Sequence, residues 1–256
     1  MKTFIPMMTL SFILSSCSTS PTGRKQLNLM SEKQMNQMGE QSFAELKKKQ
    51  NVKKDPKVNQ FVECVSKAVL KGAGEKPEDW EIKVFEDKTP NAFALPGNHI
   101  GVHTGMLDII QNPAQLAAVI GHEIGHVKAN HSNERVSQNM VAQTGLVAAN
   151  VLIGQDSEKD KLLLASLGIG AQVGFLLPFS RKHEEESDRL GVQYMAKAGF
   201  DPKQAAELWK QMAKNSKGAP PEFLSTHPSN QSRIEDLTEY AKKYPAKGEA
   251  PNCGNW

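Results

Sequence analysis

The sequence contains the five-residue motif HEIGH, which runs from His122 to His126. Histidines four positions apart lie on one face of a helix, with Cβ atoms about 5–6 Å apart, so both imidazoles can bind one ion. Zinc suits such a pair, with Zn–N distances of about 2.0–2.1 Å. Glu123 lies one residue further round the helix, where its carboxylate can accept a proton from a zinc-bound water. The motif predicts a zinc site with His122 and His126 as ligands; a surface helix carrying two ordinary histidines is the alternative.

A third ligand is expected from the acidic stretch RKHEEESDRL, residues 181–190. Glu184 and Asp188 lie one helical turn apart, so one carboxylate can bind the metal while the other holds a ligand histidine by its second nitrogen. Glu185 and Glu186 adjoin Glu184, and the spacing to Asp188 is what selects Glu184 as the ligand. A solvated acidic face, paired with neighbouring basic side chains, is the alternative.

The elements that must position these side chains follow from capping signals and hydrophobic periodicity. Asp55, Asn112 and Asp201 each precede a proline, the order of an N-cap and a first helical residue. With the periodicity, these starts predict helices at 31–50 and 55–72, a helical stretch from 112 to about 154, and helices starting near Arg181, Asp201 and Ser229. Alternating apolar residues predict short strands, at 80–86, 91–95 and 99–104, with a turn at Pro96-Gly97. This mixture of many helices with a few strands indicates the α+β class.

Four motifs occur together and in one order: NAFALPG at 91–97, HEIGH, SRKHEEESD at 180–188, and STHPS at 225–229 followed by Arg233. Together they resemble the M48 family of zinc metallopeptidases, in particular its single-domain bacterial lipoprotein members, over about residues 30–245. The resemblance implies a mainly helical zincin-like (gluzincin) domain with a small β-sheet beside the active-site helix. It also implies a zinc endopeptidase that hydrolyses unfolded or misfolded envelope proteins in protein quality control. Ser187 departs from the family pattern, which usually has Ala there.

The resemblance implies that one Zn²⁺ ion is bound by His122, His126 and Glu184. Water would hold the fourth position, as catalytic zinc sites require. Glu123 would be the general base that takes the proton of this water and passes it to the leaving amine. Asp188 would orient His122.

Further roles come from the same resemblance. His227, in the His-Pro motif, would stabilise the oxyanion of the reacting carbonyl, and Arg233 is a weaker candidate for the same wall of the site. The NAFA strand would pair with the backbone of an extended substrate, through Asn91, Ala92, Phe93 and Ala94. Plain sheet structure is the alternative for these four residues.

The composition argues against other classes of function. The 31 basic and 28 acidic residues leave a formal charge of +3, without a concentrated basic run, so a nucleic-acid partner is not expected. A hydrophobic share of 39% and a charged share of 23% are typical of a globular protein rather than a disordered one.

The N-terminus has the pattern of a secretion signal. Lys2 precedes the apolar run 4–14, which is too short to span a bilayer, and the run ends in Leu-Ser-Ser-Cys at Cys17. This ending resembles a bacterial lipobox, so we expect Cys17 to be lipidated and, with Ser18 following, the protein to be an outer-membrane lipoprotein facing the periplasm of a Gram-negative bacterium. An ordinary secretion signal is the alternative. The expected organisation is a signal peptide at 1–16, a flexible lipidated tether at 17–30, the peptidase domain at 31–245 and a tail at 246–256.

The other two cysteines are Cys64, on a predicted helix, and Cys253, in the tail. Secretion would place both in an oxidising compartment, where exposed thiols tend to pair. We therefore expect one disulfide that ties the tail to the helix, with two free thiols as the alternative.

Other readings of the whole chain remain open at this point. The apolar runs 141–154 and 162–177 are shorter than a membrane span and fit core or lid helices, or a hairpin that touches a membrane surface. A chaperone or assembly factor of the envelope with little proteolysis is one alternative function, and a non-peptidase zinc hydrolase is another. Partners would be unfolded substrates, the membrane through the lipid anchor, and further envelope proteins.

Overall fold

The computed structural model describes residues 17–153, 177–215, 227 and 231–256. The chain divides into two compact units, where the sequence predicts one peptidase domain. One unit comprises residues 1–32 and 128–180, and the other comprises residues 33–127 and 181–256. The second unit contains every residue predicted for the metal site, and we call it the catalytic unit.

The catalytic unit contains a three-stranded sheet of β3 (Glu81–Phe85), β4 (Ala92–Leu95) and β5 (His99–His103). The strand order is β3-β5-β4, with β3 parallel and β4 antiparallel to β5, so β4 is an edge strand. The predicted strands are thus confirmed to within one residue at each end. Gly97 and Asn98 turn the chain between β4 and β5 with φ angles of 86° and 68°, a left-handed conformation that Gly and Asn tolerate.

Helices surround this sheet. They are α1 (Glu32–Lys49), α2 (Pro56–Gly72), the 3₁₀ helix η2 (Pro77–Asp79), α3 (Thr104–Leu107), α4 (Pro113–Lys128), α7 (Leu177–Lys197), α8 (Lys203–Asn215) and α10 (Gln231–Lys243). Predicted N-caps hold three of them: Asp55 accepts from the Lys57 amide at 2.9 Å, Asn112 from Gln115 at 3.1 Å and Asp201 from Lys203 at 3.0 Å. The structure confirms the mainly helical α+β class.

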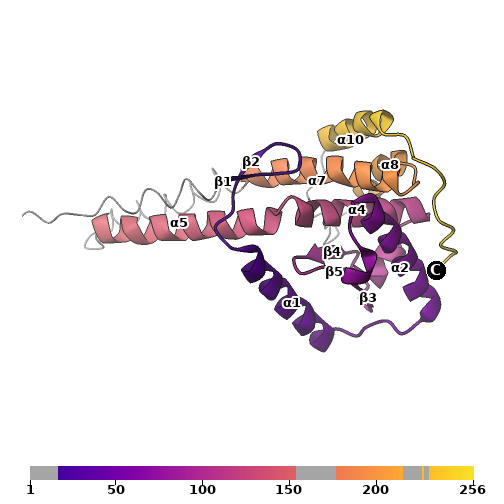
Figure 1. Cartoon of the computed structure of the whole chain (residues 1–256), viewed down its shortest axis with the longest axis horizontal. Helices are drawn as coiled ribbons and strands as arrows, with labels where there is room; N and C mark the ends of the chain where they lie inside the picture. The colour runs from indigo at the N-terminus through magenta and orange to yellow at the C-terminus, as the bar shows by residue number, and fades with distance from the viewer. Residues whose placement is uncertain (1–16, 154–176, 216–226, 228–230) are drawn as a thin grey trace, which may run out of the picture. The chain divides into compact units, whose positions relative to one another are not determined.

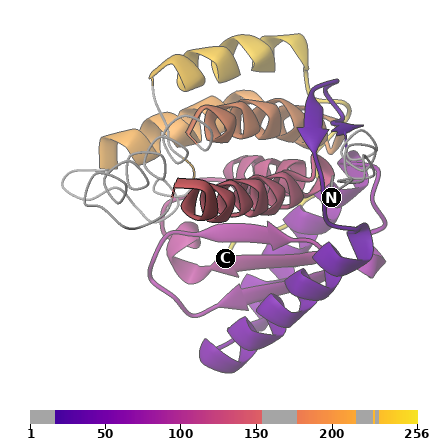
Figure 2. The ribbon, with the colours of Figure 1, turned by 90° about the vertical axis from the view of Figure 1, so that its left-hand side faces the viewer.

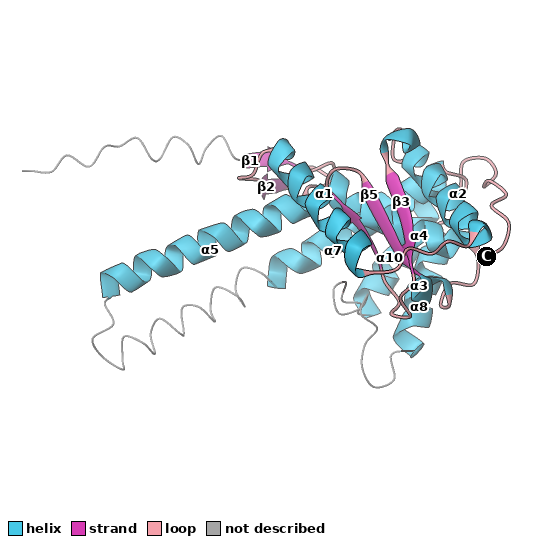
Figure 3. Cartoon of the chain, turned by 90° about the horizontal axis from the view of Figure 1, so that it is seen from below, coloured by secondary structure: helices cyan, strands magenta, loops and turns pink. Residues whose placement is uncertain are grey.

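The catalytic unit is layered. Figures 1 and 2 show α4 against one face of the sheet, α7 over α4, and α10 outermost. α1 covers the opposite face through buried Phe43, whose ring lies 5.9 Å from that of Phe85 and 4.7 Å from that of His99. Figure 3 shows α2 beside β3. Because side chains alternate along a strand, even-numbered residues of the sheet face α4 and odd-numbered residues face α1.

The crossing of α4 and α7 is unusually close because small residues line it. A Cβ added to Gly121 would lie 2.9 Å from the Gly191 carbonyl oxygen, and one added to Gly125 would lie 3.0 Å from that of Ser187. A Cβ on Gly191 would lie 2.8 Å from the backbone nitrogen of His122. The two backbones therefore touch beside the HEIGH motif, which brings side chains from both helices to one point.

The tail that follows α10 is fastened to the catalytic unit although it has no helix or strand. The structure joins Cys253 to Cys64 of α2 by a disulfide with an S–S distance of 2.07 Å. The ring of Trp256 lies 4.4 Å from that of Phe61, and its Nε1 donates to the Leu107 carbonyl at 3.1 Å. The tail thus connects α2 and α3.

The other unit contains β1 (Cys17–Thr19), β2 (Lys25–Leu27) and α5 (His131–Ile153). The two strands pair antiparallel, and the guanidinium of Arg24 donates to both carboxylate oxygens of Glu134 at 2.8 and 2.7 Å. The amide of Gln26 donates to the Glu134 carboxylate at 3.1 Å. The expectation of a flexible tether is therefore wrong for these residues, because a buried acid in α5 supplies hydrogen bonds that fix the hairpin.

Two helix boundaries also differ from the predictions. The helical stretch expected from 112 to 154 is broken between Lys128 and His131, where Asn130 adopts a φ of 54°. Helix α7 begins at Leu177 instead of near Arg181. In both places the hydrophobic pattern continues across the boundary, so periodicity alone does not locate it.

Three predictions fall wholly or mainly outside the described residues: the signal peptide at 1–16, most of the apolar run at 162–177, and most of STHPS at 225–229, of which His227 is described. Within the described residues, none of the helices combines the length and the apolar character that a membrane span requires.

Candidate metal centre

Helix α4 presents the two histidines of the HEIGH motif to one point. The Nε2 atoms of His122 and His126 lie 3.0 Å apart, and only 3% of His122 is exposed. The helical period of 3.6 residues places both rings on the same face, as the motif predicts. Two ring nitrogens this close together, with little access to water, form half of a metal-binding set.

Helix α7 adds a carboxylate to the same point. The Glu184 oxygens lie 3.3 Å from Nε2 of His122 and 3.3 Å from Nε2 of His126. Ligand atoms of a tetrahedral zinc site with bonds near 2.0–2.1 Å are about 3.3 Å apart, so this spacing fits a zinc ion at their centre. Two imidazoles and one carboxylate are also a donor set that zinc accepts. The residues present therefore fit the metal that the sequence predicts.

Asp188 holds His122 in place. Its Oδ1 lies 2.9 Å from Nδ1 of His122, so a proton on Nδ1 donates to the carboxylate and Nε2 keeps its lone pair for the metal. Burial alone would raise the pKa of Asp188, but the charge and hydrogen bonds of Arg233 keep it below its ordinary value. Asp188 therefore stays ionised and can fix the ring.

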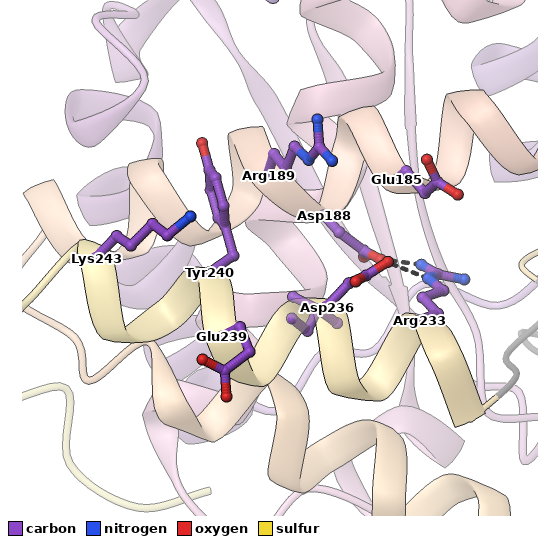
Figure 4. Close-up of a pocket in the computed structure, with 9 residues that line it drawn as sticks. Glu185, Asp188, Arg189, Arg233, Asp236, Glu239, Tyr240 and Lys243 are labelled. Carbon is purple, nitrogen blue, oxygen red and sulfur yellow. Dashed lines mark hydrogen bonds and ion pairs between the residues drawn. The ribbon is translucent and has the colours of Figure 1, made fainter.

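Arg233 of α10 joins the two acidic side chains of α7. Its Nε and Nη2 donate to Asp188 at 2.5 and 2.8 Å, and its Nη1 lies 2.9 Å from Glu184. Figure 4 shows the Arg233–Asp188 contact at the end of a small cavity of about 140 Å³ between α7 and α10. The guanidinium also lies over the ring of Trp209, 4.1 Å from its centroid. These contacts favour a positioning role over the substrate-facing role expected from sequence.

Trp209 is a residue that the sequence analysis does not single out. It lies on α8, is 4% exposed, and its ring also lies 5.9 Å from that of His122. A tryptophan at helical spacing is read as part of the core, so only its position over Arg233 reveals that it supports the site. The glycines at the α4–α7 crossing are also not singled out from sequence. The four-residue spacing of Gly121 and Gly125 is visible in the sequence, but the helix that packs on them is not.

Glu123 is buried beside the metal ligands without being one of them. Its Oε1 has no hydrogen-bond partner in the described part of the chain and lies 3.4 Å from Nε2 of His227. Burial raises the pKa of Glu123, while His227, His122 and a hydrogen bond from the Ala94 backbone lower it by smaller amounts. A carboxylate with a raised pKa is suited to accept and return a proton near neutral pH.

His227 lies inside the ligand cluster. Its Nδ1 is 3.1 Å from Nε2 of His122 and 3.1 Å from both oxygens of Glu184. Its candidate ligand atom lies within 4.8 Å of those of His122, His126 and Glu184. The structure thus places a fourth protein donor beside the three ligands expected from sequence.

The predicted substrate strand lies at the edge of the sheet. The His103 amide donates to the Asn91 carbonyl at 2.9 Å, and bonding to the neighbouring strand alternates along an antiparallel ladder. Phe93 therefore bonds to β5, whereas Ala92 and Ala94 direct their N–H and C=O groups to the outer edge. The hydrogen bond between the Ala94 backbone and Glu123 shows that this edge borders the acid. In the described residues no strand pairs with the outer edge of β4.

Known proteins similar to this chain indicate its family. The family model "Peptidase family M48" matches residues 53–241, which is most of the chain. The mitochondrial metalloendopeptidase OMA1 of Schizosaccharomyces pombe is 35% identical over 195 residues, covering 75% of this chain and 56% of that protein. The human metalloendopeptidase OMA1 is 30% identical over 262 residues, covering 94% and 49%. The beta-barrel assembly-enhancing protease of Yersinia pestis is 26% identical over 195 residues, covering 74% and 40%.

The chain spans about half the length of the curated relatives that it matches. The matched residues include HEIGH, Glu184 and Arg233, and all the donors described above lie within the match. The match confirms the resemblance drawn from the four motifs. The chain belongs to peptidase family M48.

Proposed function

We propose that this protein is a zinc-dependent endopeptidase that cleaves unfolded or misfolded proteins of the cell envelope. One observation carries the proposal: the buried Glu123 stands beside the cluster of His122, His126, Glu184 and His227 without being one of its donors. A structural zinc site needs four ligands and no base, whereas a hydrolytic site needs three ligands, a base and room for water.

The residues of the site divide the work of hydrolysis. Zinc, when bound, polarises the scissile carbonyl and makes a bound water acidic near neutral pH. Glu123 accepts the proton from water and returns it to the leaving amine. Asp188 holds His122 by its Nδ1, and Arg233 holds Asp188 and Glu184 at their spacing.

We base substrate binding on the outer edge of β4, with which no strand of the described residues pairs. An extended peptide can add to this edge through backbone hydrogen bonds with Ala92 and with the Ala94 carbonyl. The hydrogen bond between Ala94 and Glu123 places the edge next to the base. Backbone bonding requires a chain that is locally extended and does not depend on side-chain identity, so unfolded proteins are the favoured substrates.

His227 must change position during this reaction. In the structure its Nδ1 lies among the candidate metal ligands, 3.1 Å from Glu184, so with a metal bound it would compete with water for a place beside the ion. Hydrolysis requires that the ring withdraw, and the oxyanion role proposed from sequence belongs to that withdrawn position. We expect His227→Ala to keep its metal, because three ligands remain.

The envelope location is part of the proposal. The lipobox-like ending at Cys17 supports lipidation and anchoring to the outer membrane, facing the periplasm. The Cys64–Cys253 disulfide suits an oxidising compartment. A bacterial relative is named a beta-barrel assembly-enhancing protease, which favours envelope proteins as substrates and as partners.

The test combines metal analysis with product analysis. The purified protein is expected to contain one zinc per chain and to cleave a reduced, unfolded outer-membrane protein, with N-terminal sequencing of the products locating the cut bonds. Glu123→Gln should keep the zinc and lower the cleavage rate by three orders of magnitude or more. Each factor of ten in rate corresponds to about 1.4 kcal/mol of activation free energy. Glu184→Ala should lose the zinc.

Two results would contradict the proposal. Zinc content unchanged in Glu184→Ala would show that the metal assignment is wrong. A cellular defect that Glu123→Gln complements as well as the unaltered protein would favour a chaperone or assembly role over proteolysis.

A further inference from the structure

A groove of about 460 Å³ lies in the catalytic unit between α1 and the edge strand β4. Phe93, Leu95 and His103 of the sheet line it on one side, and Leu46 and Gln50 of the α1 region line it on the other. These sheet residues are odd-numbered, so the groove opens on the face opposite α4 and the metal ligands. The groove is therefore distinct from the metal centre, although both adjoin the same strand.

The Phe93 ring occupies the space that a side chain at position 101 would need. A Cβ on Gly101 would lie 2.2 Å from Cζ of Phe93, so the Phe93 ring lies directly across β5. The rings of Phe43, Phe85 and His103 lie 6.1–6.3 Å from it and hold it in this position. A ring fixed in this way offers a surface on which another apolar or aromatic side chain can pack.

A peptide bound to β4 must send side chains to both faces of the sheet. Successive residues of a strand point to opposite faces, and residues directly opposite on paired strands have Cβ atoms about 4.5–5.5 Å apart. A peptide residue opposite Ala92 or Ala94 faces α4, whereas the residue opposite Phe93 faces the groove. Every second side chain of the bound segment is therefore presented to Phe93, Leu95 and Leu46.

We propose that this groove selects a large apolar or aromatic substrate side chain at a position that alternates with those facing the metal centre. The inference rests on the proposed peptidase function and on pairing of the substrate with β4. It adds a sequence preference to a site whose backbone contacts supply none.

The charges at the rim do not favour a charged occupant. Glu45 and Lys49, both exposed, pair with each other across one turn of α1 at 3.2 Å. Their charges offset one another, so neither sign of ligand gains attraction. In addition, Oε1 of Gln50 is a buried acceptor without a hydrogen-bond partner among the described residues. A tyrosine hydroxyl or an indole N–H can donate to such an acceptor, which favours Tyr or Trp among apolar side chains.

The test measures binding and cleavage separately. The probes are fluorescent peptides of Ser, Thr and Gly that carry one Tyr, moved one position at a time, with matched Asp peptides. Binding is measured by anisotropy on the zinc-loaded Glu123→Gln protein, and cleavage on the unaltered protein. We expect Tyr to improve binding and kcat/KM about ten-fold over Asp at one or two positions, with little effect at the residues immediately adjacent, as a filled apolar pocket is worth roughly ten-fold or more.

A charge placed in the groove should change the preference. Leu46→Glu is expected to reduce the Tyr preference and to improve peptides with Lys at the same position, and Leu46→Lys should do so for Glu. Met38→Glu is the matched control, because Met38 is an exposed apolar residue of α1, 43% exposed, that does not line the groove. Its preference should match that of the unaltered protein.

The outcomes separate this inference from the proposed function. If peptides are cut but Tyr and Asp peptides behave alike, or if Leu46→Glu keeps the original preference, the groove inference is wrong and the peptidase stands. If nothing is cut, the binding assay on Glu123→Gln still decides: a position-dependent Tyr preference that Leu46→Glu removes supports the groove, and equal binding overturns it.

Discussion

The catalytic unit contains two histidine pairs that have the same sequence spacing, but only one pair brings its side chains together. His122 and His126 are four residues apart on helix α4, and their Nε2 atoms are 3.0 Å apart. His99 and His103 are four residues apart on strand β5, where four residues extend over about 13 Å. The spacing brings two side chains to one ion only when the backbone between them is helical. A histidine pair therefore predicts a metal site only together with a prediction of secondary structure.

The two histidine pairs also have different neighbours. His99 stacks on Phe43 with ring centroids 4.7 Å apart, and burial lowers its pKa, with Glu81 opposing this. Burial also tends to lower the pKa of His122, but Glu184 and Asp188 raise it to about 9. Carboxylates on a second helix thus prepare one pair for a cation, whereas aromatic rings hold the other pair as part of the sheet.

The largest expected difference is between variants that remove one histidine from each pair. His126→Ala should lose most of the bound zinc and lower kcat/KM by three orders of magnitude or more, because once His227 withdraws only His122 and Glu184 remain to hold the ion. His103→Ala should keep stoichiometric zinc. Metal analysis by mass spectrometry and peptide cleavage measure both. Zinc loss in His103→Ala equal to that in His126→Ala would remove the distinction between the pairs.

A second prediction concerns the close helix crossing that only the His122 pair has. Gly191→Ala places a methyl group 2.8 Å from the His122 backbone nitrogen and must push α7 from α4. A shift of about 1 Å at the ligands lowers activity by roughly a hundred-fold. Gly145→Ala is the control, because this helical glycine has nothing within 4 Å of an added Cβ. Equal kcat/KM for the two variants would show that the crossing does not set the site.

A third prediction concerns Arg233, which supports the His122 pair and has no counterpart described at the His99 pair. Lysine keeps the charge but cannot bridge Asp188 and Glu184 through several nitrogens, so zinc affinity should fall by about 10–100-fold, as for other partners of metal ligands. Competition with a chelating dye measures this affinity. Arg189→Lys, on the adjacent position of α7, should leave it unchanged. Unchanged affinity in Arg233→Lys would contradict the positioning role.

The smallest effect concerns the pH dependence of His99. Because the folded-state pKa of His99 lies below the ordinary value of 6.5, its contribution to stability is present above pH 6.5 and is lost as the pH falls through the folded-state pKa. When the pH is lowered from 7.5 to 5.5, the free energy of unfolding should therefore fall less in His99→Phe than in the unaltered protein. The difference between the two falls should be less than about 1 kcal/mol. Urea unfolding at both pH values measures it, and the metal ligands cancel in the difference. A larger loss in His99→Phe would show that the sign is wrong.

Much of the fold could be predicted because its signals are local. Asp55 and Asn112 cap the helices that they were expected to cap. The spacing from Glu184 to Asp188 selected, among three adjacent glutamates, the one whose oxygens reach both histidines. Such features depend on one turn of helix, which the sequence displays directly.

The features that could not be predicted depend on contacts between distant segments. The hairpin of β1 and β2 is fixed by Glu134, more than a hundred residues away. Trp209 supports Arg233 from another helix, and His227 reaches the ligand cluster from a position 43 residues beyond Glu184. Spacing within one segment carries no information about such meetings.

The fastened tail has a consequence for how the protein responds to reducing agents. Residues 244–256 form neither helix nor strand beyond the end of α10, so tertiary contacts must hold them in place. The disulfide at Cys253 and the stacking of Trp256 on Phe61 fasten this segment to α2. We therefore expect reduction of the disulfide to make the tail more susceptible to added trypsin.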